Sequence, residues 1–104
     1  MNVLTKRPFV EAAKKHPNDR DALLTVYRVL SKGEFADPLS LRAVFPTLDN
    51  FKHIDKWWVI DVGGNNLRLI ACILFKPQLV YVKGIFTHQE YDKFTAEHRK
   101  RKKK

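Results

Sequence analysis

The apolar positions of this chain change their spacing near its middle. In the first half they recur every three or four residues, as at Leu23, Val26 and Leu30, which is the pattern of an amphipathic helix. From position 57 onward they form short continuous runs rich in β-branched and aromatic residues, which are typical of strands. The order of these patterns predicts an α+β fold, with helices first and a sheet afterwards.

Two helices are expected at the start of the chain. Thr5 is the expected cap of the first, and Pro17 ends it because proline cannot continue a helix. Asn18 is the expected cap of the second, and Gly33 stops it. Joined by a proline-containing turn, the two form a helical hairpin that can cover one face of a sheet.

A short third helix is expected between Asp37, as its cap, and Pro46, as its end. Strands follow, and the tripeptides Gly-Gly-Asn and Lys-Pro-Gln between them predict two reversals of the chain. Short connections of this kind join neighbouring strands into an antiparallel meander. The three expected strands are Trp57–Val62, Asn66–Phe75 and Leu79–Phe86.

A fourth helix is expected directly after the last strand. Thr87 followed three residues later by Glu90 is a capping box, which marks a helix start. His88 is then the first helical residue, and Tyr91 lies one turn later on the same face. A helix N-terminus presents free N–H groups and a partial positive charge, so a phosphate binds well there.

The totals limit the class of protein. With 104 residues, 44% of them hydrophobic, the chain can fill one core but not two. No apolar run approaches the roughly 20 residues that cross a bilayer, and the N-terminus has no stretch of signal-peptide length. We therefore expect a cytoplasmic protein that contacts no membrane. The single cysteine, Cys72, excludes an intrachain disulfide and a cysteine-based zinc site.

The positive charge is concentrated at the C-terminus. The formal net charge is +9, and the last six residues are all Lys or Arg, which leaves +3 for the rest of the chain. Adjacent like charges repel, so we expect one folded domain over residues 1–97 and an unfolded basic tail over residues 98–104. Such a block commonly contacts nucleic acid, although the same composition also fits a nuclear-import signal.

Arg68 is the one charged residue in an otherwise apolar strand. A guanidinium in such a strand must be paired or must face an open cleft. Two interpretations remain open at this point. Arg68 forms an ion pair with a carboxylate such as Asp61 or Asp92, or it binds a phosphate, which suits the planar fork of arginine.

Lys83 interrupts the next strand in a similar way. A lysine there could protect a sheet edge from aggregation, or it could serve the same site as Arg68. The choice depends on the register of the two strands, because a slip of one residue moves a side chain to the other face. The sequence leaves both interpretations open.

The histidines differ in their surroundings. His88 has the best placement, although a purely structural histidine also fits a helix start. His53 lies between Lys52 and Lys56 ahead of the sheet and could contact RNA, and His98 adjoins the basic tail. The histidines lack metal-ligand spacing, and no motif for a nucleotide cofactor or nucleophilic catalysis is present. A set of cations with one tyrosine suits a reaction whose obstacle is negative charge on phosphorus.

Three segments then point to a known family. They are LRAVFPTLDNFKHIDK, VGGNNLRLIA and THQEYDKFTAEHR, and together they span roughly residues 39–99. In these segments the chain resembles the HigB toxins of bacterial type II toxin–antitoxin systems, within the RelE-like superfamily. The resemblance implies a RelE-like fold, in which an N-terminal helical hairpin packs on an antiparallel β-sheet with a C-terminal helix. It also implies an endoribonuclease that cuts mRNA on the 30S subunit of the translating ribosome, and a cognate HigA-like helix-turn-helix antitoxin.

The resemblance also assigns the site residues. The strand arginine of the family falls on Arg68, and its histidine and tyrosine fall on His88 and Tyr91. In metal-independent cleavage the ribose 2′-hydroxyl attacks the adjacent phosphate. Arg68 would stabilise charge, His88 would transfer a proton, and Tyr91 would orient the phosphate or stack on a base. No metal or cofactor is expected. The expected RNA-binding residues are Lys52, His53, Lys56, Lys83, His98 and Arg99.

Two alternatives share this fold. One is a non-catalytic RNA- or ribosome-binding domain, and the other is a toxin of the same superfamily that poisons gyrase. The combination of arginine, histidine and tyrosine favours the ribonuclease, because a protein that only binds RNA needs no proton-transfer group.

Overall fold

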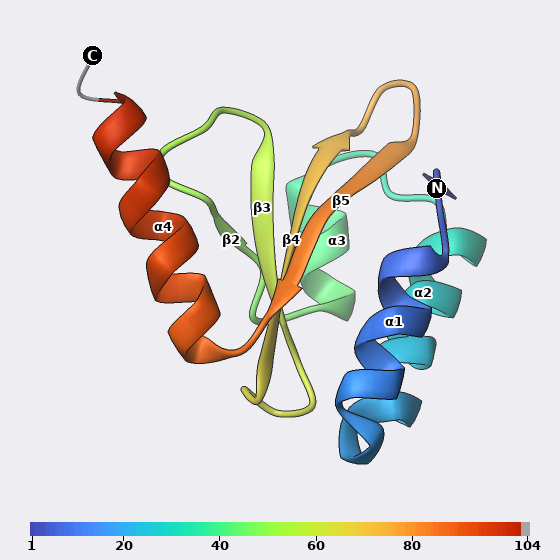
Figure 1. Cartoon of the computed structure of the whole chain (residues 1–104). Coiled ribbons are helices and arrows are strands. Elements are labelled where there is room, and N and C mark those ends of the chain that lie inside the picture. Colours follow the sequence, from blue (N-terminus) through green and yellow to red (C-terminus); the bar gives the residue numbers. More distant parts are fainter. Residues whose placement is uncertain (103–104) are drawn as a thin grey trace.

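A five-stranded sheet lies between two layers of helix in the computed structural model, which describes residues 1–102 and side chains through Arg99 (Figure 1). The strand order across the sheet is β1-β5-β4-β3-β2. The strands are β1 (Asn2–Val3), β2 (Asp49–Asn50), β3 (Trp57–Val62), β4 (Leu67–Leu74) and β5 (Leu79–Phe86). The helices are α1 (Arg7–Lys15), α2 (Arg20–Lys32), α3 (Pro38–Val44) and α4 (His88–Lys102), and a 3-10 turn, η1, spans Pro17–Asp19.

The predicted helical hairpin is present, with two corrections at its helix starts. The cap of α1 is Lys6 rather than Thr5, although the Thr5 hydroxyl accepts a hydrogen bond from the Arg7 N–H at 3.2 Å. Asn18 does not cap α2, because it lies inside the 3-10 turn and α2 begins only at Arg20. The turn forms because the Asp19 N–H bonds to the carbonyl of the residue before Pro17, which tightens the connection.

The later helix signals are confirmed at their expected positions. Asp37 caps α3 and forms a capping box with Ser40, whose N–H donates to the Asp37 carboxylate at 2.9 Å. Gly33 follows the last residue of α2, but its backbone is extended rather than left-handed. A Cβ at this position would lie 2.6 Å from the Phe35 ring, so a larger residue would force that ring to move.

The three predicted strands are confirmed and form the expected antiparallel meander. The sheet as a whole is mixed rather than antiparallel, because β1 pairs with β5 in the parallel direction. Strands β1 and β2 were not predicted from the sequence. Each has only two residues, too few to show the alternation that marks a strand.

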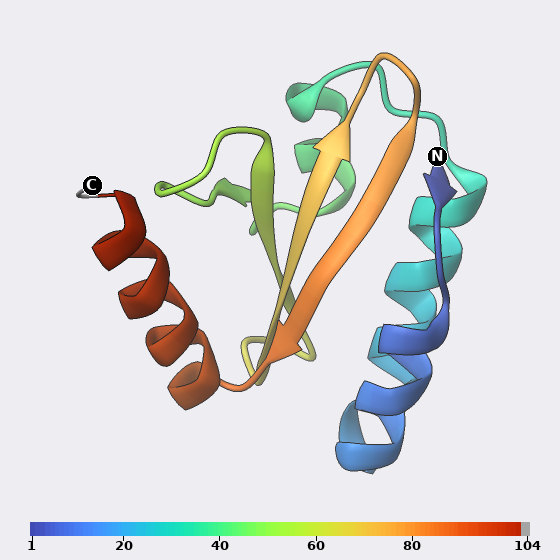
Figure 2. The same cartoon turned by 45° about the horizontal axis from the view of Figure 1, so that its top comes forward.

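The two faces of the sheet pack against different helices (Figure 2). Leu67 and Leu69 of β4 belong to the main core with the buried residues of α1 and α2. Ile70 belongs to a second, smaller cluster, against which Phe94 of α4 packs. Successive strand residues point to opposite faces, so Arg68 shares the α4 side with Ile70.

Helix α4 extends into the basic segment. The backbone is helical through Lys102, where charge repulsion predicts an unfolded tail. Starting a helix costs more free energy than adding residues to one that has begun. The capped start of α4 therefore accounts for the extension of the helix into the basic segment. Residues 103–104 lie outside the described part of the chain, and the division at residue 98 stays a prediction. Among the described residues, no helix is long and apolar enough to span a membrane.

Candidate functional site

Arg68 projects from β4 toward helix α4. Its guanidinium carbon lies 4.6 Å from the centre of the Tyr91 ring, in a cation–π contact. Arg68 is also the cross-strand partner of Asp61, and its Nε lies 3.7 Å from a carboxylate oxygen of Asp61. Of the two pairings considered from the sequence, the one with Asp61 is therefore present. The Arg68 side chain nevertheless remains 30% exposed, so solvent still reaches part of it.

The pairing with Asp61 does not saturate the guanidinium. The Nε of Arg68 is buried and has no hydrogen-bond partner among the residues that the structure describes. A separation of 3.7 Å is too long for a hydrogen bond, so charge and the tyrosine ring hold the arginine in place. This arrangement fixes the position of the Arg68 guanidinium and leaves its N–H donors available for other hydrogen bonds.

Tyr91 lies one turn into α4, between the arginine and a small cavity. Its ring meets the Phe51 ring edge-on, with a centroid distance of 6.5 Å. Tyr91 also lines a cavity of about 220 Å³, together with Lys52 and His53 of the loop between β2 and β3. The cavity therefore joins α4 to that loop beside the site of Arg68.

His88 is the first residue of α4, as its capping box predicts. The Thr87 N–H donates to the Glu90 carboxylate at 2.9 Å, and the Glu90 N–H donates to the Thr87 hydroxyl at 3.3 Å. The Nε2 of His88 lies 2.6 Å from the backbone oxygen of Asn65. A carbonyl only accepts hydrogen bonds, so in the neutral imidazole this contact favours the tautomer with the proton on Nε2 and Nδ1 as the acceptor.

The turn that holds His88 is itself supported by the helical hairpin. Gly63 and Gly64 both have positive φ, of 64° and 75°, as the tight reversal requires. The Asn66 side chain donates to the Asp19 carboxylate at 3.1 Å, and a Cβ on Gly63 would lie 2.3 Å from that carboxylate. The N-terminal hairpin thus fixes the turn whose carbonyl orients His88.

Arg68 and His88 lie at the same end of the sheet. Arg68 pairs with Phe86, two residues before His88, and the Asn65 carbonyl that His88 contacts is three residues before Arg68. Figure 1 shows the turn between β3 and β4 close to the start of α4. Of the predicted catalytic residues, the structure brings Arg68 and Tyr91 into contact and places His88 at the same end.

A β-bulge decides the face on which Lys83 lies. Gly84 pairs with Ile70 and Val82 pairs with Ala71, so Lys83 is an extra residue between the two pairs. Its ammonium lies 5.3 Å from the centre of the Trp57 ring, and that ring packs on the α4 side of the sheet. Lys83 therefore shares a face with Arg68, which the sequence alone could not establish.

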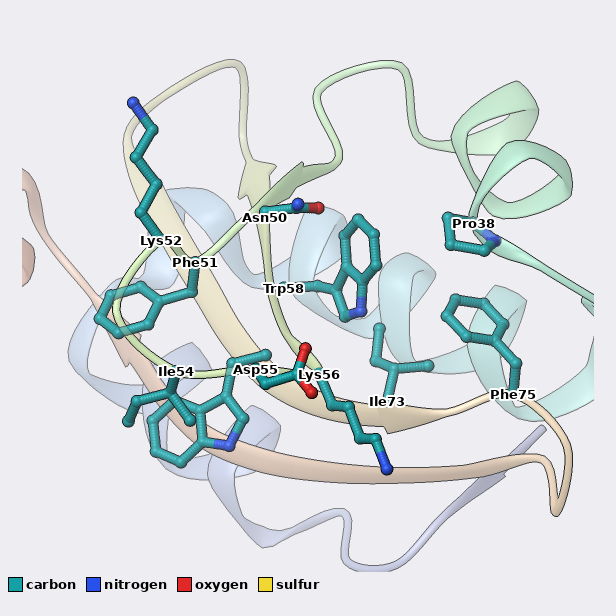
Figure 3. Close-up of a pocket in the computed structure, with 11 residues that line it drawn as sticks. Pro38, Asn50, Phe51, Lys52, Ile54, Asp55, Lys56, Trp58, Ile73 and Phe75 are labelled. Carbon is teal, nitrogen blue, oxygen red and sulfur yellow. The ribbon is translucent and has the colours of Figure 1, made fainter.

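The predicted RNA-binding residues of the loop between β2 and β3 divide into two groups. Lys52 and His53 line the small cavity with Tyr91. Lys56, with a positive φ of 67°, instead lines a larger cavity of about 530 Å³ (Figure 3). Lys52 and Asn50 border both cavities, so this segment forms the ridge between them.

His98 and Arg99 have different surroundings on α4. His98 is half-buried, its Nδ1 lies 2.8 Å from the Phe94 carbonyl oxygen, and its ring packs 4.1 Å from the Phe94 ring. It also lies 5.6 Å from the Trp57 ring, so it is part of an aromatic cluster. Arg99 is exposed. RNA contact by either residue stays a prediction.

Two residues near the site were not singled out from the sequence. Asn65 acts through its backbone oxygen, which no residue pattern reveals. Asn50 borders both cavities but lies in a strand too short to show a period. The only sequence feature that could have pointed to Asn50 is its position, directly before the aromatic and basic loop.

Comparison with known proteins identifies the family of the chain. Residues 19–94 match the model of the HigB_toxin family, described as the RelE-like toxic component of a toxin–antitoxin system. The chain is 50% identical over 102 residues to an mRNA interferase HigB of Escherichia coli O6:H1, covering 98% of this chain and 99% of that protein. It is 45% identical over 104 residues to the mRNA interferase toxin HigB of Escherichia coli K12 and to the mRNA interferase HigB of Shigella flexneri, covering all of each chain.

The family match covers most of the chain, and the relatives align with it from end to end. The chain belongs to the HigB toxins, the RelE-like toxic components of toxin–antitoxin systems.

Proposed function

We propose that the protein is an mRNA interferase, an endoribonuclease toxin that inhibits translation by cutting mRNA. Relatives that are 45% to 50% identical over nearly their whole length carry this name. The observation that carries the proposal is the contact of Arg68 with the Tyr91 ring at 4.6 Å, at the end of the sheet where His88 is oriented. These contacts support a site at one end of the sheet that combines a cation, an aromatic ring and a proton acceptor.

The proposed reaction uses the 2′-hydroxyl of the substrate as nucleophile. The 2′ oxygen bonds to phosphorus, and the bond from phosphorus to the 5′ oxygen breaks. The departing 5′ oxygen takes up a proton from a general acid, so the products are a 2′,3′-cyclic phosphate and a 5′-hydroxyl end. Since the Nε2 proton of His88 is donated to Asn65, Nδ1 is the nitrogen that takes the 2′-hydroxyl proton. The Arg68 guanidinium stabilises the charge that develops on the phosphate oxygens.

The other predicted RNA-binding residues extend this site along the α4 side of the sheet. Lys83 lies on the same face as Arg68, and Lys52 and His53 line the cavity next to Tyr91. Phosphates on either side of the cleaved bond would contact these side chains, which fix the register of the RNA without reading its sequence. We propose that the reaction takes place on the 30S subunit of the ribosome, where bound mRNA is presented to these side chains.

As a toxin of a toxin–antitoxin system, the protein has an antitoxin partner. We propose that this antitoxin is a HigA-like helix-turn-helix protein and that both act in the bacterial cytoplasm. Co-purification of the toxin with the product of an adjacent gene, followed by inhibition of cleavage, tests this part of the proposal. Failure of that product to bind the toxin would contradict it.

A direct test maps mRNA 5′ ends in a ribosome-coupled translation reaction. The wild type is expected to create new ends, and Arg68→Ala is expected to lower the cleavage rate by about a hundred- to thousandfold, as for loss of a charge-stabilising donor. His88→Ala is expected to lower it by about a hundredfold or more. Arg20→Ala serves as the matched control, since Arg20 is an exposed arginine on α2.

Circular dichroism verifies that each variant is folded before its rate is compared. New ends with Arg20→Ala but not with the two site variants would support catalysis at this site. Wild-type rates in folded Arg68→Ala and His88→Ala would contradict it. Ribosome binding by the wild type without any new ends would indicate a non-catalytic RNA-binding domain.

A further inference from the structure

The larger cavity lies on the other side of the ridge from Tyr91 and is not used by the proposed reaction. Figure 3 shows the Trp58 indole, the Phe75 ring and the Ile73 side chain facing the same space, below Pro38. The Trp58 and Phe75 rings meet edge-to-face, with centroids 6.1 Å apart and planes at 88°. The cavity measures about 530 Å³, which is within the range of small-ligand sites.

Its aromatic walls remain open because the neighbouring strand is short. Asn50 is the cross-strand partner of Trp58 and also the last residue of β2. Strand β2 ends there, and both Trp58 and Phe75 are only half-buried among the residues that the structure describes. Partly exposed aromatic rings of this kind are suited to stacking or edge contacts with a flat ligand.

The polar residues of the cavity favour a base over a phosphate in its interior. The Asn50 side chain projects toward the cavity (Figure 3), and an amide both donates and accepts hydrogen bonds, as the edge of a base does. Asp55 also lines the cavity, and its carboxylate would repel a phosphate placed inside. Lys56 lines the same cavity. Lys52 lies on the ridge and points away from the cavity, so a phosphate that contacts Lys52 would lie outside the cavity.

We propose that this cavity binds one unstacked nucleobase of the RNA whose phosphate contacts Arg68 and Tyr91. The inference rests on the proposed function, since the ligand is the same RNA. Trp58 packs on the opposite face of the sheet from Tyr91. The two cavities share Asn50, Phe51 and Lys52 at the β2 edge of the sheet, so an RNA strand that passes Tyr91 would round this edge to reach Trp58. Single-stranded RNA is commonly recognised in this way, by bases held against aromatic side chains.

The test uses 2′-O-methyl RNA oligonucleotides, which lack the attacking hydroxyl and stay intact. An abasic nucleotide is moved through the oligonucleotide one position at a time, and the dissociation constant is measured for each. The wild type is expected to lose about tenfold in affinity when one particular base is missing, as for removal of a stacked base. That position-specific loss is expected to disappear in Trp58→Leu and in Phe75→Leu, and to be retained largely in Trp58→Phe.

Two control variants separate this inference from the proposed function. Tyr81→Leu removes an aromatic ring that is 39% exposed and does not line the cavity, and it should keep the position-specific loss. Arg68→Ala should weaken all oligonucleotides alike and also keep it. Thermal unfolding of each variant verifies its fold.

The inference is overturned if the wild type shows no abasic position with a specific loss, or if Trp58→Leu retains that loss. Failure of the wild type to bind these oligonucleotides overturns it as well. Protection of Trp58 from a fluorescence quencher by the antitoxin, but not by RNA, would assign the cavity to a protein contact instead. If no abasic position changes the affinity but wild type and Trp58→Leu both still cleave mRNA, this inference fails and the proposed function stands.

Discussion

At the scale of single residues, Tyr91 connects the parts of the site. Its ring contacts the Arg68 guanidinium at 4.6 Å, meets Phe51 edge-on, and lines the small cavity with His53. The ring positions the arginine, whereas the hydroxyl could only bind a phosphate or transfer a proton. These two roles predict different behaviour in two variants.

Tyr91→Phe is expected to keep the guanidinium in place, because the cation–π contact needs only the ring, and cleavage should fall by less than about tenfold. Tyr91→Ala removes the contact, which is worth about 0.5 to 2 kcal/mol, and should lower cleavage by about two- to thirtyfold, more than Tyr91→Phe does. Single-turnover cleavage of ribosome-bound mRNA measures both. A Tyr91→Phe variant as inactive as Tyr91→Ala would show that the hydroxyl acts, and would contradict the positioning role.

The sequence indicated that Arg68 is important but could not indicate the sheet face on which Lys83 lies, for a physical reason. A charge inside an apolar strand is visible as a break in the pattern, so Arg68 could be predicted to matter. The face of Lys83 depends on a β-bulge, which shifts the pairing between Gly84 and Val82. A bulge of one residue leaves no signal in the order of apolar and polar positions.

At the scale of elements, the start of α4 sets the position of His88. The capping box of Thr87 and Glu90 fixes the first turn of the helix, and the hydrogen bond from the Thr87 N–H lowers the pKa of the Glu90 carboxyl. Burial opposes this shift, while Lys15 and His16 at the end of α1 reinforce it. The ionised carboxylate therefore stabilises this end of the fold.

A pH titration of stability checks this contribution. Because folding lowers the pKa of Glu90, its stabilising effect is complete above the ordinary pKa of a glutamate and is lost as the pH falls through the lowered value. Glu90→Ala should destabilise the protein at neutral pH, by about 1 kcal/mol as for loss of a cap, and much less in acid. Denaturant unfolding across this pH range would reveal the convergence. A difference that stays constant into acid would show that the carboxylate charge is irrelevant.

Strands were predicted correctly where they are long enough for the pattern of apolar residues to be recognised. The strands β3, β4 and β5 have six to eight residues each and were predicted within one residue of their observed ends. The two-residue strands β1 and β2 were missed, and with them the parallel pairing at one edge. The ridge between the two cavities begins at β2, so this part of the candidate site could not be predicted from the sequence either.

At the scale of the whole molecule, the positive charge is divided between the folded body and its C-terminal end. Of the formal net charge of +9, the last six residues account for six positive charges. The body supplies cations at defined places, such as Arg68 and Lys83. The C-terminal segment instead supplies charge density, and its first residues continue α4.

Truncation after His98 should therefore weaken binding to ribosomes or single-stranded RNA mainly at low salt. If all six cations contact phosphates, the slope of log affinity against log salt should decrease in magnitude by at most about 4. Filter binding at several salt concentrations gives this slope. Lys14→Ala combined with Lys15→Ala, on the exposed surface of α1, is the matched control. An unchanged slope after truncation would mean that the segment does not contact RNA.

The most direct measurement of the proposed chemistry replaces the 2′-hydroxyl at the cleavage site with hydrogen in ribosome-bound mRNA. Wild-type protein should cut the unmodified mRNA and leave a 2′,3′-cyclic phosphate, and it should not cut the 2′-deoxy form at that site. Cleavage of the 2′-deoxy form at a similar rate, or products with a 5′-phosphate and a 3′-hydroxyl, would contradict attack by the 2′-hydroxyl at the site of Arg68, His88 and Tyr91.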